Sequence, residues 1–143
     1  SELRNMVYQS LASGVKGLTF WAYEAGEFKL YKTPAGLKNV KRITGEVQTL
    51  SPILLSDELK AAPLLITKNP ALLTRCFVHD KKTFLMAVNL TRAKTKIEVS
   101  AITGQISGEV KVLFDEKALT TKDGKLSEEI EPIGVRVYEI IIK

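Results

Sequence analysis

Residues 14–23, GVKGLTFWAY, are the most informative segment of this sequence. The segment is apolar and β-prone, opens with a glycine and ends in the aromatic side chains of Phe20, Trp21 and Tyr23. An apolar run of this length between two helical patterns is typical of a parallel-sheet strand that is buried on both faces. One such strand cannot bury itself, and the sequence contains no second βαβ unit. We therefore expect this chain to be the end of a larger protein.

Helical periodicity precedes this segment. Residues 2–13 place apolar side chains on one face at steps of three and four, which predicts an amphipathic helix. Gly14 follows as a natural C-cap in the left-handed region. The predicted helix and strand are then joined by only one or two residues, as in α/β units.

A polar loop and a second helix follow the segment. Residues 24–36, EAGEFKLYKTPAG, hold Glu24 and Glu27 in the loop. Loops after the strands of α/β barrels form the active-site face, so a ligand would bind there. Thr33 then fits an N-cap, and apolar residues at steps of three and four predict a helix to about residue 50, where Pro52 breaks or kinks it.

Beyond the connector 56–63, SDELKAAP, the hydrophobic period changes to two. Alternating runs separated by turn sequences predict antiparallel strands, and about six or seven strands in roughly 80 residues fit a β-sandwich. In the last run, residues 134–142, both parities are apolar, which predicts cover on both faces or a bulge. The predicted fold class is α+β, with a strand-and-helix unit at 1–60 and a small antiparallel sandwich at 61–143.

Composition excludes several classes of site. The longest apolar runs are far shorter than the roughly 20 residues of a membrane span. Cys76 is the only cysteine and His79 the only histidine, so we expect no disulfide, no metal site and no cofactor. Cys76 lies in an apolar run and is interpreted as a buried free thiol, and His79 as a turn residue.

The net charge of +5 raises the possibility of a nucleic-acid partner. Residues 1–60 carry 8 basic and 6 acidic side chains, and residues 61–143 carry 13 and 10. An excess spread in this way is typical of a solvated surface, and we expect neither a nucleic-acid nor a membrane partner. The alternative of a phosphate-binding surface depends on charge alone, at Lys81, Lys82, Arg92, Lys94 and Lys96.

The order of these parts resembles the C-terminal end of (β/α)8-barrel glycoside hydrolases. Residues 3–26, LRNMVYQSLASGVKGLTFWAYEAG, look like the seventh barrel helix, the eighth strand and the loop beyond. Residues 37–56 look like the last barrel helix, and FLMAVNLT with GVRVYEIII looks like the sandwich that such enzymes often carry. The resemblance is closest to β-galactosidase-like members of the retaining clan that contains family 42, and it covers only the end of such an enzyme, because a barrel takes about 250 residues.

The resemblance implies a sugar-binding role for the aromatic end of the segment. In those enzymes a tryptophan at the end of strand eight lines the floor of the sugar site, often before a non-proline cis peptide, and the matching residue here is Trp21. An indole face packs well on the C–H patch of a pyranose ring. The implied substrate-binding residues are Trp21, Tyr23 and Glu24, and the alternative for Trp21 is a filler of the core.

The resemblance also implies what is missing. Retaining hydrolysis needs two carboxylates about 5 Å apart, and in this clan they belong to strands that precede this chain. We therefore predict no catalytic residue here, and a partner chain or oligomer that completes the barrel and binds carbohydrate with it. The alternative is a non-catalytic structural or carbohydrate-binding sandwich module.

Overall fold

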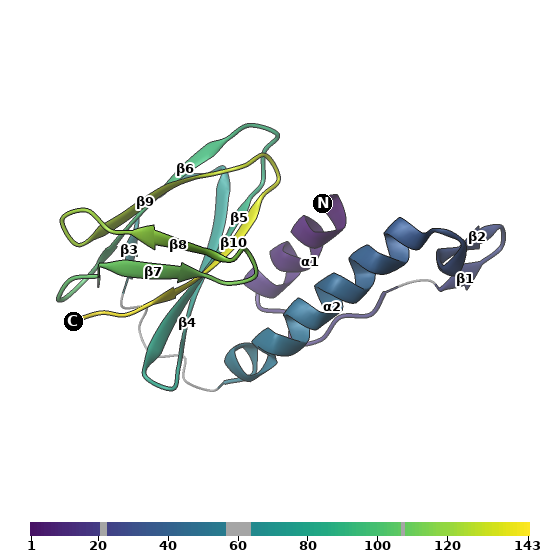
Figure 1. The fold of residues 1–143 in the computed structure, drawn as a ribbon, viewed down its shortest axis with the longest axis horizontal. Coiled ribbons are helices and arrows are strands. Elements are labelled where there is room, and N and C mark those ends of the chain that lie inside the picture. Colours follow the sequence, from purple (N-terminus) through teal and green to yellow (C-terminus); the bar gives the residue numbers. More distant parts are fainter. Residues whose placement is uncertain (21–22, 57–63, 107) are drawn as a thin grey trace.

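The structure is a computed structural model that describes residues 1–20, 23–56, 64–106 and 108–143 (Figure 1). The N-terminal part holds two α-helices and a small hairpin: α1 (Glu2–Ala12), β1 (Glu24–Ala25), β2 (Phe28–Lys29), the 3-10 helix η1 (Leu30–Lys32) and α2 (Pro34–Leu54). Eight strands follow: β3 (Leu64–Ile66), β4 (Leu72–His79), β5 (Lys82–Asn89), β6 (Thr95–Ala101), β7 (Glu109–Val112), β8 (Lys117–Thr120), β9 (Lys125–Ile130) and β10 (Val135–Ile140).

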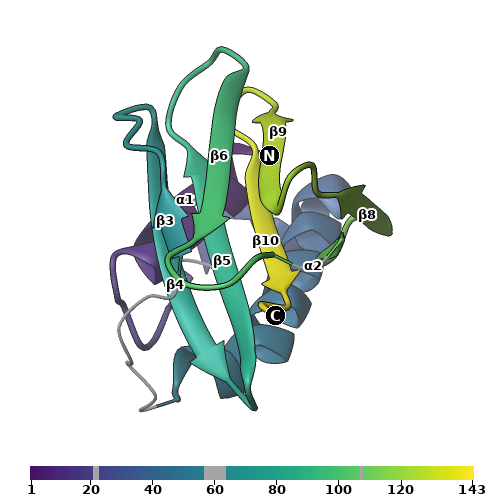
Figure 2. The ribbon, with the colours of Figure 1, turned by 90° about the vertical axis from the view of Figure 1, so that its left-hand side faces the viewer.

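The eight strands form two sheets that pack face to face (Figure 2). The larger sheet has the order β4-β5-β10-β7-β8 and the smaller one the order β3-β6-β9. Every described pairing is antiparallel. The predicted antiparallel sandwich is confirmed, although β3 and β8 were not predicted as strands.

Both helices lie against the outer face of the five-stranded sheet, so the molecule has three layers (Figure 1). In β5, an interior strand of the larger sheet, Phe84, Met86 and Val88 pack against the helices, while Leu85 and Ala87 face the smaller sheet. The last strand, β10, divides its side chains between the same two cores. Of the two alternatives predicted for the last strand, cover on both faces or a bulge, the structure shows cover on both faces.

The end of α1 has the geometry that the sequence predicts. Gly14 has φ +101°, in the left-handed region that glycine adopts without strain. Its N–H donates to the Leu11 carbonyl at 3.0 Å, and the Val15 N–H donates to the Ser10 carbonyl at 3.1 Å. This pair of hydrogen bonds is a Schellman motif, which satisfies carbonyls that the helix end leaves free.

The end of α2 differs from the prediction, because the helix runs through Pro52 to Leu54. Pro52 lies in the last turn and is exposed, so it removes only one helical hydrogen bond. The next two side chains, Ile53 and Leu54, are buried in the core between helices and sheet, and that burial favours helix over a break. At the other end, Thr33 is the N-cap residue, but its hydroxyl donates to the Leu30 carbonyl instead of capping the helix.

A buried ion pair joins the two helices to each other and to the sandwich. The Arg4 Nε lies 2.7 Å from a Glu46 carboxylate oxygen, and the Tyr8 hydroxyl donates to the same carboxylate at 2.8 Å. A second Arg4 nitrogen donates to the Val135 carbonyl of β10 at 3.2 Å. Burial first, and then the Glu46 charge, raise the pKa of Tyr8. The helices and the sandwich thus share a core. The sequence predicts a domain boundary between residues 60 and 61, in the connector 56–63. Most of this connector lies outside the described residues.

The segment 15–20 does not form the predicted buried strand. It has no regular secondary structure, and neither Val15 (40% exposed) nor Phe20 (37% exposed) is buried. It is held by Leu18, which packs on the helical core, and by Lys16, whose Nζ donates to the Leu54 carbonyl at 2.7 Å. The described residues offer no strand beside it, and a strand needs a hydrogen-bonding neighbour.

Candidate functional site

The loop that follows this segment forms a hairpin at the end of α2 that is remote from the sandwich (Figure 1). In its register Glu24 lies opposite Lys29. Gly26, with φ +56°, makes the turn, and the Leu30 N–H donates to the Tyr23 carbonyl at 3.0 Å. The hairpin therefore brings residues 23–24 next to residues 29–31.

Two tyrosines and an ion pair cover one side of this hairpin. The ring centroids of Tyr23 and Tyr31 are 5.5 Å apart, with 35° between the ring planes. The Lys29 Nζ lies 2.5 Å from a Glu24 carboxylate oxygen and 5.9 Å from the Tyr31 ring centroid. The hydrogen bond to Glu24, followed by one to Tyr31, raises the pKa of Lys29. We call Tyr23, Glu24, Lys29 and Tyr31 the tyrosine hairpin.

The tyrosine hairpin has the chemistry of a polar ligand site rather than of a catalytic pair. Tyr23 is 61% exposed and Tyr31 is 40% exposed, so both rings can meet a ligand. Aromatic faces accept the C–H patch of a sugar, and the carboxylate and ammonium groups can bond hydroxyls. Glu24 is held in an ion pair with Lys29.

Two of the three predicted binding residues, Tyr23 and Glu24, lie together in this hairpin. Trp21, and the bond from it to Ala22, lie outside the described residues. The sequence prediction missed Tyr31 and Lys29. Its available signal was Gly26 in the run EAGEFK, because a glycine turn there pairs residue 24 with residue 29. Glu27 lies at the exposed tip of the turn.

Elsewhere in the described residues, the remaining reactive side chains are dispersed. They contain no group of three His, Cys, Asp or Glu side chains that could hold a metal ion. Burial raises the pKa of the Cys76 thiol to about 11, which disfavours the reactive thiolate. His79 ends β4, with its Nε2 3.5 Å from a carboxylate oxygen of Asp80 in the next turn. Neither described helix has both the length and the apolarity to cross a bilayer.

Four of the five basic residues considered for phosphate binding have acidic partners. Lys82 pairs with Glu139 at 2.8 Å, Lys94 with Glu131 at 2.9 Å, Lys96 with Glu98 at 2.6 Å and Arg92 with Glu2 at 3.1 Å. An ion-paired cation attracts a phosphate less strongly than a free one. The structure therefore gives these residues an intramolecular role.

Comparison with known proteins yields matches only among solved structures: no family model and no curated protein matches the sequence. An α-amylase from Anoxybacillus superposes with a TM-score of 0.55 at 20% identity, over 76% of this chain and 23% of the amylase. An α-amylase from Geobacillus thermoleovorans, solved with acarbose, gives 0.57 at 12% identity, over 77% of this chain and 24% of its own.

The whole helix-and-sandwich arrangement recurs in a third solved structure. A putative α-galactosidase from Bacteroides fragilis covers 98% of this chain with a TM-score of 0.56 at 9% identity. The match takes 28% of that chain, so this chain spans about a quarter of the length of the structures that it resembles. At these identities the likeness establishes a shared fold, the fold of one part of larger glycosyl hydrolases.

Proposed function

We propose that this chain is the C-terminal portion of a carbohydrate-active glycoside hydrolase and is not catalytic alone. The observation that carries the proposal is the unpaired apolar segment 15–20, held between two helices that are themselves packed on a sandwich. An apolar segment with exposed Val15 and Phe20 is a surface that a protein normally covers. The finer assignment, the eighth barrel strand of a retaining family-42-like enzyme, comes from the sequence resemblance.

The exposed face of α2 supports this placement. Its outward side chains are polar and include Lys38, Lys41, Thr44 and Gln48, as expected for the solvent side of an outer barrel helix. Its buried side chains face the sandwich and α1. The segment 15–20 is therefore the part of the helical layer that needs a partner, and strands supplied by the rest of the barrel would give it hydrogen bonds and cover.

Within the complete enzyme, we assign Trp21, Tyr23 and Glu24 to substrate binding. The exposed ring pair of Tyr23 and Tyr31, and the Glu24–Lys29 ion pair, support this assignment. The hairpin comes soon after the segment 15–20 in the sequence. A barrel strand at 15–23 would therefore place the hairpin at the active-site face. Tyr23 would stack on a sugar ring, and Glu24 would accept a hydrogen bond from a sugar hydroxyl.

Reconstitution tests the proposal. The chain is coexpressed with a polypeptide that carries the preceding barrel strands of a family-42-like enzyme, and chromogenic glycosides are assayed with each part and with both. We expect hydrolysis only when both polypeptides are present. We expect a lower kcat/KM when the Tyr23→Ala variant of this chain takes the place of the native chain. A matched variant, Tyr138→Phe in the sandwich, should leave kcat/KM unchanged, because Tyr138 is fully buried far from this hairpin.

Two results would count against the proposal. Hydrolysis by the 143 residues alone would place a catalytic pair in this chain. Stable folding without any association with barrel fragments, combined with binding of neutral oligosaccharide to the sandwich alone, would favour the alternative of a free-standing binding module.

A further inference from the structure

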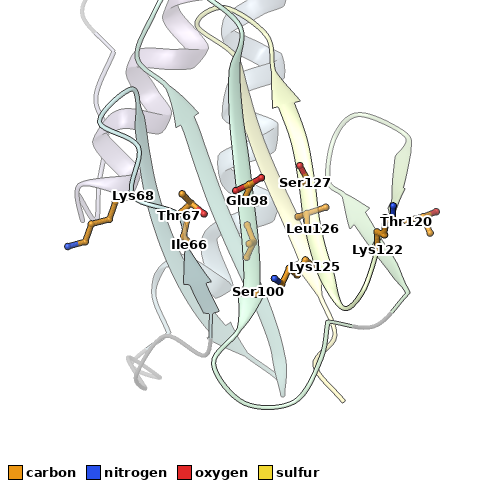
Figure 3. A pocket seen from close by; sticks show the side chains of 11 residues that line it. Ile66, Thr67, Lys68, Glu98, Ser100, Thr120, Lys122, Lys125, Leu126 and Ser127 are labelled. Atoms are coloured by element: carbon orange, nitrogen blue, oxygen red, sulfur yellow. The ribbon is translucent and has the colours of Figure 1, made fainter.

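The outer face of the three-stranded sheet holds a hollow of about 640 Å³ (Figure 3). Such a volume lies within the range of roughly 300–1,000 Å³ that ligand pockets occupy. In the register of the sheet, Ser100 lies opposite Lys125 and Glu98 opposite Ser127. Thr67 lies beside Glu98, because the Thr67 N–H donates to the Glu98 carbonyl at 3.0 Å. Hydroxyl side chains thus lie at each of the three strands, Thr67 by β3, Ser100 on β6 and Ser127 on β9 (Figure 3).

Lysines surround these hydroxyls. Lys68 lies on the β3 side, and Lys122 and Lys125 lie on the β9 side (Figure 3). The two lysines on the β9 side are fixed by a tight turn in which the backbone groups of Lys122 and Lys125 bond each other at 3.0 and 2.9 Å. Among the described residues, none of these three ammonium groups has a carboxylate within 4.0 Å, and this includes Asp123 in the same turn.

Glu98, the only carboxylate among the lining residues that the structure describes, already has a partner. Its hydrogen bond to Lys96, at 2.6 Å, is the main cause that holds the pKa of Glu98 below its ordinary value. The charge of Lys96 and, more weakly, that of Lys125 act in the same direction. The hollow is therefore lined by three lysines, of which Lys68 points its ammonium group away from the hollow (Figure 3), and by the hydroxyl residues Thr67, Ser100, Thr120 and Ser127. The Thr67 hydroxyl already bonds Glu98.

We propose that this hollow binds an acidic glycan, a chain of sugars that carries carboxylate or sulfate groups. Lysine ammonium groups pair with the anionic substituents, and serine and threonine hydroxyls bond the sugar hydroxyls. The described residues of the lining include no aromatic residue and no arginine. Single-stranded nucleic acid is held by bases that stack on aromatic or arginine side chains, so this lining does not favour a nucleic acid.

The choice of a glycan among polyanions rests on the proposed function, whereas the anion-binding surface itself does not. The site would hold a substrate chain at the sandwich while the tyrosine hairpin contacts sugar elsewhere. Both sites then belong to one chain but depend on separate residues, which allows them to be tested independently.

The test is a titration of the full 143-residue chain with oligogalacturonate and, separately, with a sulfated galacto-oligosaccharide. Binding is measured by calorimetry and by NMR chemical-shift changes. We expect both to bind, to shift the amides of Ser100 and Ser127, and to be weakened by salt. The variant K68A/K122A/K125A should bind roughly tenfold more weakly, since exposed ion pairs contribute only modestly each.

A matched variant, K38A/K41A/K111A, removes the same charge from exposed positions outside the hollow and should bind within about twofold of the native chain. An equal loss in both variants, or no binding to either acidic glycan, would overturn the proposal. Equal affinity for a neutral galacto-oligosaccharide would remove the role of charge. Equal affinity for single-stranded DNA would make the hollow a general polyanion site and remove the glycan.

Failure here and failure of the proposed function are distinguishable. Reconstituted hydrolysis of a neutral chromogenic glycoside does not need the hollow. If hydrolysis succeeds and acidic glycans do not bind, only the hollow is discounted. If acidic glycans bind and hydrolysis never appears, the surface stands and the glycosidase assignment falls.

Discussion

Two segments with apolar side chains, residues 82–89 and 15–20, differ in how far they are buried. Residues 82–89 form β5, in which every side chain from Thr83 to Asn89 is buried. Residues 15–20, VKGLTF, have apolar side chains at three of six positions, yet they form no strand and leave Val15 and Phe20 exposed. The difference lies in their neighbours. β5 has β4 and β10 on its two edges, the helices on one face and the smaller sheet on the other.

The comparison teaches that an apolar run becomes a strand only where edges and faces are supplied. β5 obtains all four within this chain. The segment 15–20 has one face, on the helices, and no edge among the described residues. An apolar run is stable as a strand only when it is buried, and whether it is buried depends on the neighbours that the rest of the chain supplies.

Phe84→Ala should give the largest effect, because it breaks the satisfied side of the comparison. Phe84 is 6% exposed and packs between β5 and the helices. Its truncation leaves a cavity and should lower the free energy of unfolding by about 3–5 kcal/mol. Urea denaturation measures it. A loss below about 1 kcal/mol would mean that the helical layer does not pack on β5 as described.

Glu46→Ala tests the polar link that holds the helical layer in place. The substitution leaves Arg4 buried without its partner, at 10% side-chain exposure. An uncompensated buried charge should cost about 3 kcal/mol, at the lower end of the usual range because Arg4 keeps its bond to the Val135 carbonyl. The double variant Arg4→Met with Glu46→Leu should recover much of this loss, and a double-mutant cycle by urea denaturation measures the coupling.

Glu128→Gln tests the opposite, sandwich side of the sheet. Glu128 accepts hydrogen bonds from the Tyr138 hydroxyl at 2.6 Å and from Lys117 at 2.7 Å, and from Arg136 at 3.2 Å. Burial opposes ionisation, but these bonds and the Arg136 charge together hold the pKa of Glu128 below its ordinary value of 4.5. Loss of the charge should cost about 1–3 kcal/mol at neutral pH.

The pH dependence of that difference follows from the sign of the shift. Because the folded-state pKa of Glu128 is the lower one, its contribution is complete above the unfolded-state value. The contribution is lost as the pH falls through the folded-state value. The gap in unfolding free energy between native chain and variant should therefore narrow below pH 4.5. A gap that stays constant from pH 7 to about pH 3 would contradict this account.

The sandwich was predictable because its information is local. Period-two alternation gave most of the strands of the described sandwich, and turn residues such as Asp80, Asp123 and Gly124 adopt the positive φ angles that those turns need. β3 was missed because its three residues show too little alternation, and β8 because its run, KALT, is mostly exposed. Pro52 was misjudged because burial of the residues after it outweighs one lost hydrogen bond.

The candidate sites were less predictable because they depend on register. Tyr23 and Glu24 were named from the family resemblance and from their position after the apolar segment, and their binding role stays a prediction. Finding their neighbours Lys29 and Tyr31 requires the register of the hairpin. Finding the hollow requires knowing that three strands from distant parts of the sequence lie side by side. Alternation tells which residues point outward but not which strand lies next to which.

Phe20→Ala should give the smallest effect and sharpens the comparison most, because it removes the same side chain as Phe84→Ala. Phe20 is 37% exposed and outside any strand, so the isolated chain should lose no more than about 0.5 kcal/mol of unfolding free energy. In the reconstituted enzyme we expect the reverse, with impaired association and hydrolysis, since the phenyl ring would then be buried among barrel strands. A loss above about 1 kcal/mol in the isolated chain would show that the segment already serves its own core. A variant that is neutral in both settings would leave the segment without a partner to explain it, and the barrel interpretation would fail with it.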